Sequence, residues 1–448
     1  MKDIQDWLAE LMKEGAGNPP SRVTVRAVRR QRARRRAVAP IWAAAAIAVV
    51  AAVTTGLLGR SGVPSPAASP TVSASPVPCV TGWSAAAVAA PAGDYQDRLV
   101  AVAGSASDDI WAAGDRSLDP SHAFPLLEHW NGHQWAYSAG ASLGGRQAFL
   151  TDVAVLASND AWAVGNFASV GARPPAPLVE HWNGQSWSLQ PTAALARLKV
   201  ALPQILTSVV ALAAGDVWVL GHPGPGSSDA YLHWNGTSWK LFPGPDISPS
   251  FGSAAMQVIG ADRLGHLWAV GGTIRGNGEA GIPGDGIVER WNGSRWVVSV
   301  PAAWRKPLTM VAPVSQDDVW AITGGSFTSV GTYGISPVQM LHWDGTSWKP
   351  ALTLGGTIPA EVTGLAAVSA SNVYVTGQDA STKQPFIKHW DGTSWKNVPL
   401  GPVSHLRLAG SSGSQNPSLA VASDGSIVAL DSGVVTSPKN FLWLACQQ

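Results

Sequence analysis

Five histidines recur in one seven-residue pattern, His-Trp-(Asn/Asp)-Gly-x-x-Trp, and their spacing bears on whether they could bind a metal. They are His129, His181, His233, His342 and His389, and Arg290 takes the same place in a sixth copy. A metal ion needs imidazoles that converge on one point, whereas one histidine per copy of a repeat places them apart in the fold. We therefore predict a structural role for these histidines, with no metal and no other cofactor.

Seven polar residues outside the repeated patterns are the candidates for ligand binding. They are Arg116, His122, Arg173, Arg275, Glu279, Asp285 and Tyr333. They fall in the longer connections that we expect over residues 115–125, 166–177, 272–286 and 325–337. Connections carried by a rigid scaffold hold binding residues more often than tight turns do. A single sequence does not show whether these side chains converge.

The chain lacks the short patterns of common catalytic sites. It contains no G-x-S-x-G, no P-loop, no C-x-x-C and no H-E-x-x-H. We therefore predict a protein without enzymatic activity. An extracytoplasmic lyase or hydrolase stays open as an alternative.

The elements that position these residues follow from two half-motifs, which repeat every 50–56 residues from about residue 98. One reads Asp-x-Trp-Ala-Val-Gly, as at 160–165, and the other is the histidine pattern, as at 181–187. Together they account for most of the 22 tryptophans. Residues 151–156, 161–165, 178–182 and 186–189 alternate with turn signals and predict four antiparallel strands in one unit. Asn183-Gly184 is the strongest of these signals, since its turn needs positive φ.

Four-stranded units of this period are typical of β-propeller blades. We predict an all-β, seven-bladed propeller over residues 79–448, in which the tryptophans pack neighbouring blades together. The pattern resembles the kelch repeat of galactose-oxidase-type propellers, including double glycines at 271–272 and 324–325. His-Trp-Asn-Gly-Thr-Ser-Trp arrays also resemble membrane-anchored cell-envelope propellers of actinobacteria. These resemblances imply a fold and a compartment, not an activity.

The seventh blade is expected to draw on both ends of the repeat region. Residues 419–430 and 441–446 supply three strands, and 81–84 resembles the fourth strand of the other units. This closure would bring Cys79 close to Cys446, and an oxidising exterior favours a disulfide between them.

The N-terminal region predicts a membrane anchor. Residues 1–38 carry ten Lys/Arg against four Asp/Glu, although the whole chain has a net charge of only +1. Residues 39–59 are apolar and uncharged, long enough to cross a bilayer. Six arginines between 29 and 36 place the N-terminus in the cytoplasm. A cleaved signal peptide is the rival interpretation, and residues 60–78 form a Pro/Ser-rich linker.

These features give three competing functions. The first is a cell-membrane-anchored binding module that engages an envelope polymer or a protein through its long connections. The second is transmembrane signalling of the anti-sigma-factor type, in which the tail binds a cytoplasmic protein rather than anionic lipid alone. The third is the enzyme named above. No nucleic-acid partner is expected.

Overall fold

The structure is a computed structural model that describes the repeat region with gaps. Described are residues 84–87, 96–119, 122–168, 176–191, 205–222, 229–245, 253–275, 282–299, 306–323, 338–354, 361–379, 382, 384–399, 419–421, 427–431 and 441–445. The predicted tail, membrane span and linker lie outside these residues. Within the described ranges, no helix has the length and apolar character needed to cross a membrane.

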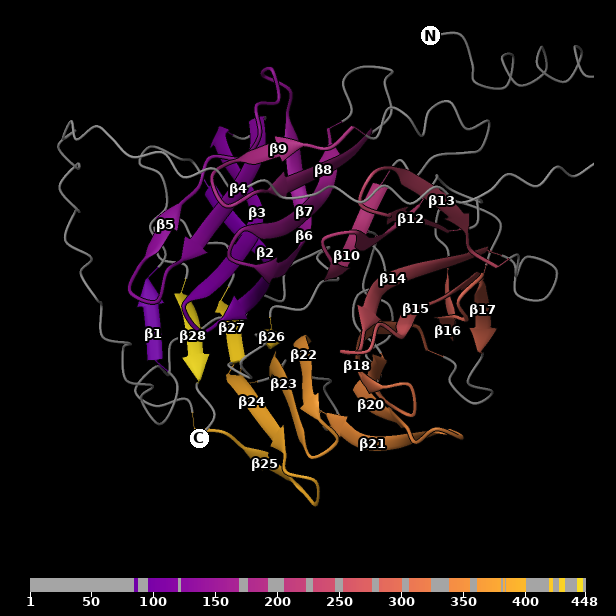
Figure 1. The fold of residues 1–448 in the computed structure, drawn as a ribbon. Coiled ribbons are helices and arrows are strands. Elements are labelled where there is room, and N and C mark those ends of the chain that lie inside the picture. The colour runs from indigo at the N-terminus through magenta and orange to yellow at the C-terminus, as the bar shows by residue number, and fades with distance from the viewer. Residues whose placement is uncertain are drawn as a thin grey trace, which may run out of the picture. The chain divides into compact units, whose positions relative to one another are not determined.

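Each copy of the repeat forms one four-stranded antiparallel sheet, with its strands side by side in chain order (Figure 1). Sheet 1 contains β2 (Gln96–Ala106), β3 (Asp109–Asp119), β4 (His122–Trp130) and β5 (Trp135–Tyr137). Sheet 2 contains β6 (Ala148–Ala157), β7 (Asp160–Phe167), β8 (Ala176–Trp182) and β9 (Trp187–Leu189). Sheet 3 contains β10 (Ile205–Ala213), β11 (Asp216–His222), β12 (Ala230–Trp234) and β13 (Trp239–Pro243).

The next three sheets repeat this arrangement. Sheet 4 contains β14 (Ser253–Ala261), β15 (Leu267–Arg275), β16 (Ile282–Trp291) and β17 (Trp296–Ser299). Sheet 5 contains β18 (Leu308–Ser315), β19 (Asp318–Thr323), β20 (Val338–Trp343) and β21 (Trp348–Leu354). Sheet 6 contains β22 (Glu361–Ser369), β23 (Asn372–Gln378), β24 (Pro385–Trp390) and β25 (Trp395–Asn397). The predicted all-β class and the four strands per repeat are confirmed.

A further sheet, here the terminal sheet, joins strands from both ends of the repeat region. Its order is β1-β28-β27-β26, with bounds β1 (Ser84–Ala87), β26 (Leu419–Val421), β27 (Ile427–Asp431) and β28 (Phe441–Ala445). β1 pairs with β28 in antiparallel register, with Ser84 opposite Leu444.

The first strands of successive sheets pack against one another in chain order, from β2 on β6 to β22 on β26. β26 also contacts β2, so the terminal sheet touches both the first sheet and the sixth. Figure 1 shows these first strands nearer the centre, with β13, β17, β21 and β25 farther out. The six sheets are therefore blades of a β-propeller.

Tryptophan pairs hold neighbouring blades together. The second-strand Trp111 of sheet 1 meets Trp187 of sheet 2 edge-to-face, with ring centroids 5.0 Å apart and an interplanar angle of 87°. The same contact recurs at four later interfaces, where the angles lie between 82° and 89°. Edge-to-face geometry is favoured by the ring quadrupole and stabilises the contact beyond what burial of the ring area provides. The predicted packing role of these tryptophans is confirmed.

The connections between second and third strands are shorter than predicted. Residues 115–119 and 122–125 were expected in a loop but extend hairpin β3–β4, and Arg116 lies opposite Phe124. In the same way, Arg275 ends β15 opposite Ile282, and Asp285 lies within β16. Polar residues suggested loops here. Backbone pairing does not depend on apolar side chains once a hairpin is set in register, so the strands continue.

Candidate functional site

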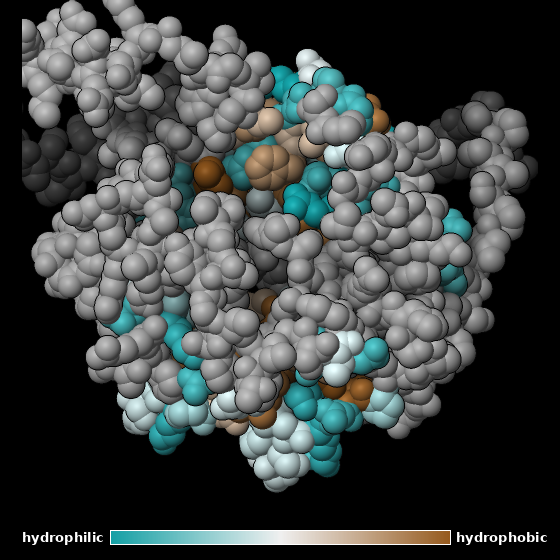
Figure 2. Space-filling model, turned by 180° about the vertical axis from the view of Figure 1, so that it is seen from behind, coloured by the Kyte–Doolittle hydropathy of each residue, from teal (hydrophilic) through white to brown (hydrophobic). Residues whose placement is uncertain are grey.

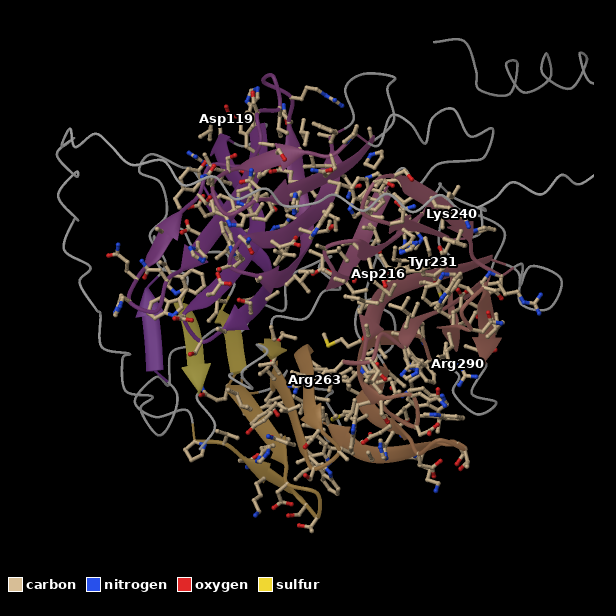
Figure 3. The ribbon with its side chains drawn as sticks, in the orientation of Figure 1. Asp119, Asp216, Tyr231, Lys240, Arg263 and Arg290 are labelled. Atoms are coloured by element: carbon tan, nitrogen blue, oxygen red, sulfur yellow. The ribbon has the colours of Figure 1, made fainter. Side chains whose placement is uncertain are left out.

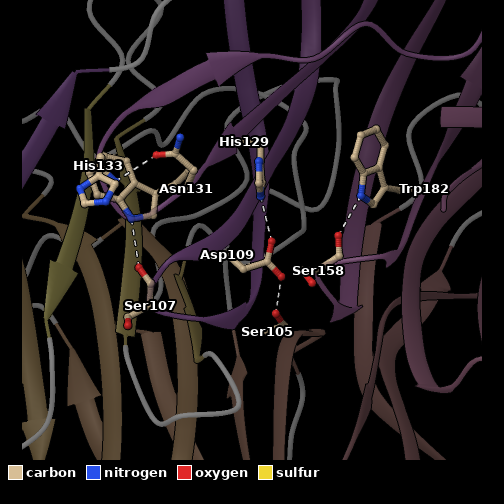
Figure 4. Close-up of polar contacts among 9 residues, drawn as sticks. Ser105, Ser107, Asp109, His129, Asn131, His133, Ser158 and Trp182 are labelled. Carbon is tan, nitrogen blue, oxygen red and sulfur yellow. Dashed lines mark hydrogen bonds and ion pairs between the residues drawn. The ribbon is translucent and has the colours of Figure 1, made fainter. Parts of the chain in front are cut away.

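The motif histidines are held inside each blade by two contacts. In sheet 1, His129 Nε2 donates to Asp109 Oδ1 over 2.8 Å (Figure 4). Its ring also stacks on Trp111, with the ring centroids 4.4 Å apart. The Asp109 side chain also accepts a hydrogen bond from the Ser105 hydroxyl. Sheets 2, 3 and 5 repeat the pair with His–Asp distances of 3.0, 2.9 and 2.7 Å. Each imidazole thus links the second and third strands of its own blade.

Two blades vary this unit. In sheet 4, Arg290 replaces the histidine, and its guanidinium carbon lies 5.5 Å from the centroid of the Trp268 ring (Figure 3). In sheet 6, His389 Nε2 meets the amide oxygen of Asn372 at 2.8 Å instead of a carboxylate. Burial lowers the pKa of His389. Among the described residues, no cluster of three or more His, Cys, Asp or Glu could hold a metal ion.

One end of each sheet, here the tight-turn end, carries the turns between strands one and two and between strands three and four. In the latter, the Asn or Asp Oδ1 accepts two backbone N–H groups of its own turn. These residues are Asn131, Asn183, Asn235, Asn292, Asp344 and Asp391. The glycine that follows each has φ between 87° and 90°. The turn side chains are therefore largely occupied by their own backbone.

The opposite end, here the long-connection end, carries the connections between strands two and three and those between sheets. On sheet 1 it presents Arg116, whose Nη1 lies 3.5 Å from the Tyr137 hydroxyl and whose guanidinium carbon is 5.4 Å from that ring's centroid. His122 is exposed, and its Nδ1 lies 2.7 Å from Asp119 Oδ2. Figure 3 labels Asp119 at the tip of hairpin β3–β4. A cation, an aromatic ring and an imidazole here can bind a polar ligand.

On sheet 3 the long-connection end holds a second His–Asp pair with the other ring nitrogen engaged. His222 Nδ1 lies 2.5 Å from Asp229 Oδ1, while Asp229 Oδ2 accepts the Met256 backbone N–H over 2.7 Å. The Asp229 side chain is 4% exposed and that of His222 is 20% exposed. A buried carboxylate at Nδ1 fixes the tautomer whose Nε2 can accept a proton.

Buried carboxyl groups lie between the blades. Glu180 Oε2 accepts the Ala141 N–H over 2.8 Å, and Glu289 Oε2 accepts the Tyr231 hydroxyl over 2.7 Å. Tyr231 belongs to sheet 3 and Glu289 to sheet 4, so their bond joins neighbouring sheets, whereas Ala141 lies in the connection that leads from sheet 1 into sheet 2. Burial raises the pKa of Glu180 to about 7 and that of Glu289 to about 8.

Two more carboxyl groups are buried, Glu128 within sheet 1 and Asp152 against sheet 3. Burial, with the nearby Asp97 carboxylate, raises the pKa of Glu128 to about 8. Burial raises the pKa of Asp152 to about 7, although Asp152 accepts hydrogen bonds from Ser208 Oγ (2.9 Å) and the Val209 N–H (2.8 Å) of sheet 3. The contacts of Glu289 and Asp152 with sheet 3 are therefore coupled to the protonation of these two carboxyl groups.

The structure places some of the predicted binding residues and leaves others outside the described ranges. Arg116 and His122 share the long-connection end of sheet 1. Arg275 and Asp285 both belong to sheet 4, three sheets farther along, and the Asp285 N–H donates to Thr273 Oγ1 over 2.8 Å. Outside the described residues lie Arg173, Glu279, Tyr333, Cys79 and Cys446.

Sequence reasoning missed His222 and Asp229, and also Arg146, which precedes β6. A usable signal was the residue after the second-strand glycine. There the repeat changes from Asp115 to Asn166 to His222, while the motif around it stays constant. A position that varies within a constant repeat is free to take a role of its own.

Large exposed hydrophobic residues are scattered over the described part of sheets 1 to 4. They are Leu118, Tyr137, Leu189, Ile205 and Leu264. On the face shown in Figure 2, the coloured residues near the margin are mostly hydrophilic to neutral, and the hydrophobic ones form small groups. Polar recognition therefore fits the described surface better than docking of a broad apolar face.

Comparisons with known proteins support the fold and no more. No protein-family model matches the chain, and no curated protein matches it. Among solved structures it is similar to YCF48 from Cyanidioschyzon merolae, with a TM-score of 0.50 and 14% identity over 82% of this chain and 99% of that one. It is also similar to the GH74 xyloglucanase from Xanthomonas campestris, with a TM-score of 0.50 and 11% identity over 81% of this chain and 55% of that one. At such identities only the β-propeller fold is shared.

Proposed function

We propose that this β-propeller is a non-enzymatic binding module, anchored in the cell membrane, that engages a cell-envelope polymer or a protein through its long-connection end. The observation that carries the proposal is the contrast between the two ends of the sheets. At the tight-turn end the repeated Asn and Asp side chains bond their own backbone. At the other end, sheet 1 presents Arg116 beside Tyr137, and the exposed His122.

The proposal includes a seven-bladed ring and a single-pass topology. The terminal sheet supplies the seventh blade, with β1 as its outermost strand, and a Cys79–Cys446 disulfide secures it. The uncharged run 39–59 spans the membrane, with the arginine-rich tail inside and the propeller outside. Protease added to spheroplasts should then degrade the propeller and spare the tail, and a protected C-terminal tag would contradict this orientation.

Binding can be tested with the full-length protein in detergent and isolated envelope fractions. Cosedimentation should fall when Arg116 and His122 are both replaced by alanine. The matched control is Lys349→Ala, which removes an exposed cation that pairs with Asp344 at the tight-turn end. Equal loss in both variants, or undiminished binding in the first, would place the binding surface elsewhere.

A second candidate, an extracytoplasmic lyase or hydrolase, is favoured by the His222–Asp229 pair alone. Its geometry is that of a general base oriented by a carboxylate. If such chemistry exists, His222→Gln should abolish turnover of an envelope polysaccharide but leave its binding intact. A variant that keeps full turnover would remove this support for an enzyme.

A further inference from the structure

An arginine at the start of sheet 2 is held in one orientation by its surroundings. Arg146 lies in the connection from β5 to β6, and its guanidinium carbon is 3.5 Å from the centroid of the Phe167 ring. Phe167 ends β7 and is 8% exposed, and the guanidinium packs directly against its ring. Arginine is the side chain best suited to stacking on an aromatic face, and the contact limits its rotamers.

The backbone around Arg146 is also fixed. The Arg146 N–H donates to the Leu143 carbonyl over 3.3 Å, and the Ala168 N–H donates to the Gln147 carbonyl over 2.9 Å. The second bond ties the connection to the chain that leaves β7. A side chain on such a support loses little conformational entropy when it binds a ligand.

The charge of Arg146 is not neutralised by the described part of the chain. The side chain is exposed and forms no ion pair with any described residue, whereas Arg98 on sheet 1 contacts Asp115 at 2.6 Å. Next to it, Gly144 and Gly145 have φ of 61° and 78°, and a Cβ added to either would meet no atom within 4 Å. The turn beside Arg146 therefore carries no side chain at these two positions and has open space where each Cβ would lie.

We propose that Arg146 is the anchor of an oxyanion subsite, through which the propeller binds the carboxylate or phosphate groups of an acidic envelope polymer. A planar guanidinium stacked on one face still offers its in-plane N–H groups, which match these oxyanions with two parallel hydrogen bonds. The subsite rests on the proposed function and names its ligand class. It lies at the same long-connection end as Arg116, on the neighbouring sheet.

The test measures binding of full-length protein in detergent to three probes by calorimetry. Polygalacturonate offers carboxylates, poly(glycerol phosphate) offers phosphodiesters, and dextran is neutral. Arg146→Ala should weaken binding of the preferred acidic polymer by about tenfold or more, as expected for charge-assisted hydrogen bonds. Arg146→Lys keeps the positive charge but loses the two parallel N–H donors of the guanidinium, so its affinity should lie between those of wild type and Arg146→Ala. Phe167→Leu keeps an apolar side chain but removes the ring, and should also weaken binding.

Arg263 provides the control, because it is an exposed arginine in the turn between β14 and β15, at the tight-turn end (Figure 3). Arg263→Ala should leave the affinity within about twofold of wild type. If the Arg146 and Arg263 alanine variants lose the same affinity, the effect comes from the net charge of the protein and not from a subsite at Arg146, and the proposal is wrong. Wild-type protein that binds neither acidic polymer would overturn it too. Binding of envelope material that needs Arg116 but not Arg146 would refute this inference and leave the proposed function standing.

Discussion

At the scale of single residues, two glycines with the same backbone conformation allow two costs of substitution to be measured separately. One is the strain of a left-handed backbone, and the other is steric contact of the added Cβ. Gly184 and Gly293 both follow the Asn of a tight turn, with φ of 90° and 89°. A Cβ at Gly184 would lie 2.8 Å from Asn159 Cβ, whereas one at Gly293 would meet nothing within 4 Å. Both alanine variants should lose about 1–2 kcal/mol for the left-handed backbone.

We predict that Gly184→Ala costs roughly 1 kcal/mol more than Gly293→Ala, since Asn159 must move. Denaturant midpoints of the two variants and wild type measure the difference. Equal midpoints would show that the contact with Asn159 relaxes freely.

The histidine of sheet 6, which lacks a paired aspartate, allows the effect of that aspartate on the histidine pKa to be tested. His389 faces Asn372, and burial lowers its pKa. In Asn372→Asp a carboxylate would accept the Nε2–H bond and favour the imidazolium, so the pKa of His389 should rise. NMR titration of the imidazole measures the change. Asn372→Ser, which restores no charge, should leave the pKa low, and an unchanged value in the aspartate variant would contradict the argument.

Residues of this kind were predictable to different degrees. The positive φ of Gly184 followed from the Asn-Gly turn, because the turn type demands it. The contact of His129 with Asp109 did not, because it depends on the register between β3 and β4. Arg146 was missed because its partner Phe167 is remote in sequence and carries no motif.

At the scale of strands and sheets, the buried glutamates make blade packing depend on pH. The pKa of Glu289 is raised from 4.5 to about 8 by burial. Between these values the folded protein holds a proton that the unfolded chain releases, so rising pH favours unfolding. The stabilisation is complete below about pH 4.5 and is lost as the pH rises through about 8.

We predict that Glu289→Gln flattens this dependence. A glutamine oxygen can still accept the Tyr231 hydroxyl, but the side chain has no proton to lose. The free energy of unfolding of wild type should fall more steeply between pH 5 and 8 than that of the variant, by up to about 1 kcal/mol per pH unit. Urea titrations at several pH values measure both slopes. Parallel curves would mean that Glu289 ionises normally in the folded protein.

Strand positions were predictable where turn chemistry marked both ends, as in residues 161–165 of β7. Strand positions were not predictable where polar residues continue a hairpin. Ser117 and Ala123 face each other in β3 and β4, although the segment 115–125 has a loop-like composition. Apolar composition marks strand residues that are buried. The ends of β3 and β4 pair through their backbones without being buried, so their composition does not mark them as strand.

At the scale of the whole molecule, repetition made the architecture predictable from one sequence. A unit that recurs with the same strands must bury the same faces against its neighbours, which predicts stacked blades before any contact is known. The ligand was not predictable in this way, because candidate binding residues such as Arg116 occur in one blade only. Because proteins of different activities share the β-propeller fold, the fold alone does not show which ligand this chain binds.

The last prediction concerns how the propeller closes. β1 and β28 pair in antiparallel register, so the start of β1 and the end of β28 lie at the same end of this strand pair. Cys79 lies shortly before β1, and Cys446 directly follows β28, although both are outside the described residues.

A disulfide between Cys79 and Cys446 would close a loop of nearly the whole propeller, and the chain-entropy model gives it about 5–6 kcal/mol as an upper value. We predict that Cys79→Ser lowers the melting temperature of the oxidised protein and that adding Cys446→Ser lowers it no further. A reducing agent should bring wild type down to the variants. Mass spectrometry of a non-reduced digest should recover the two cysteine peptides linked. If both thiols of the native, oxidised protein react freely with a maleimide, the terminal strands are held by backbone pairing alone.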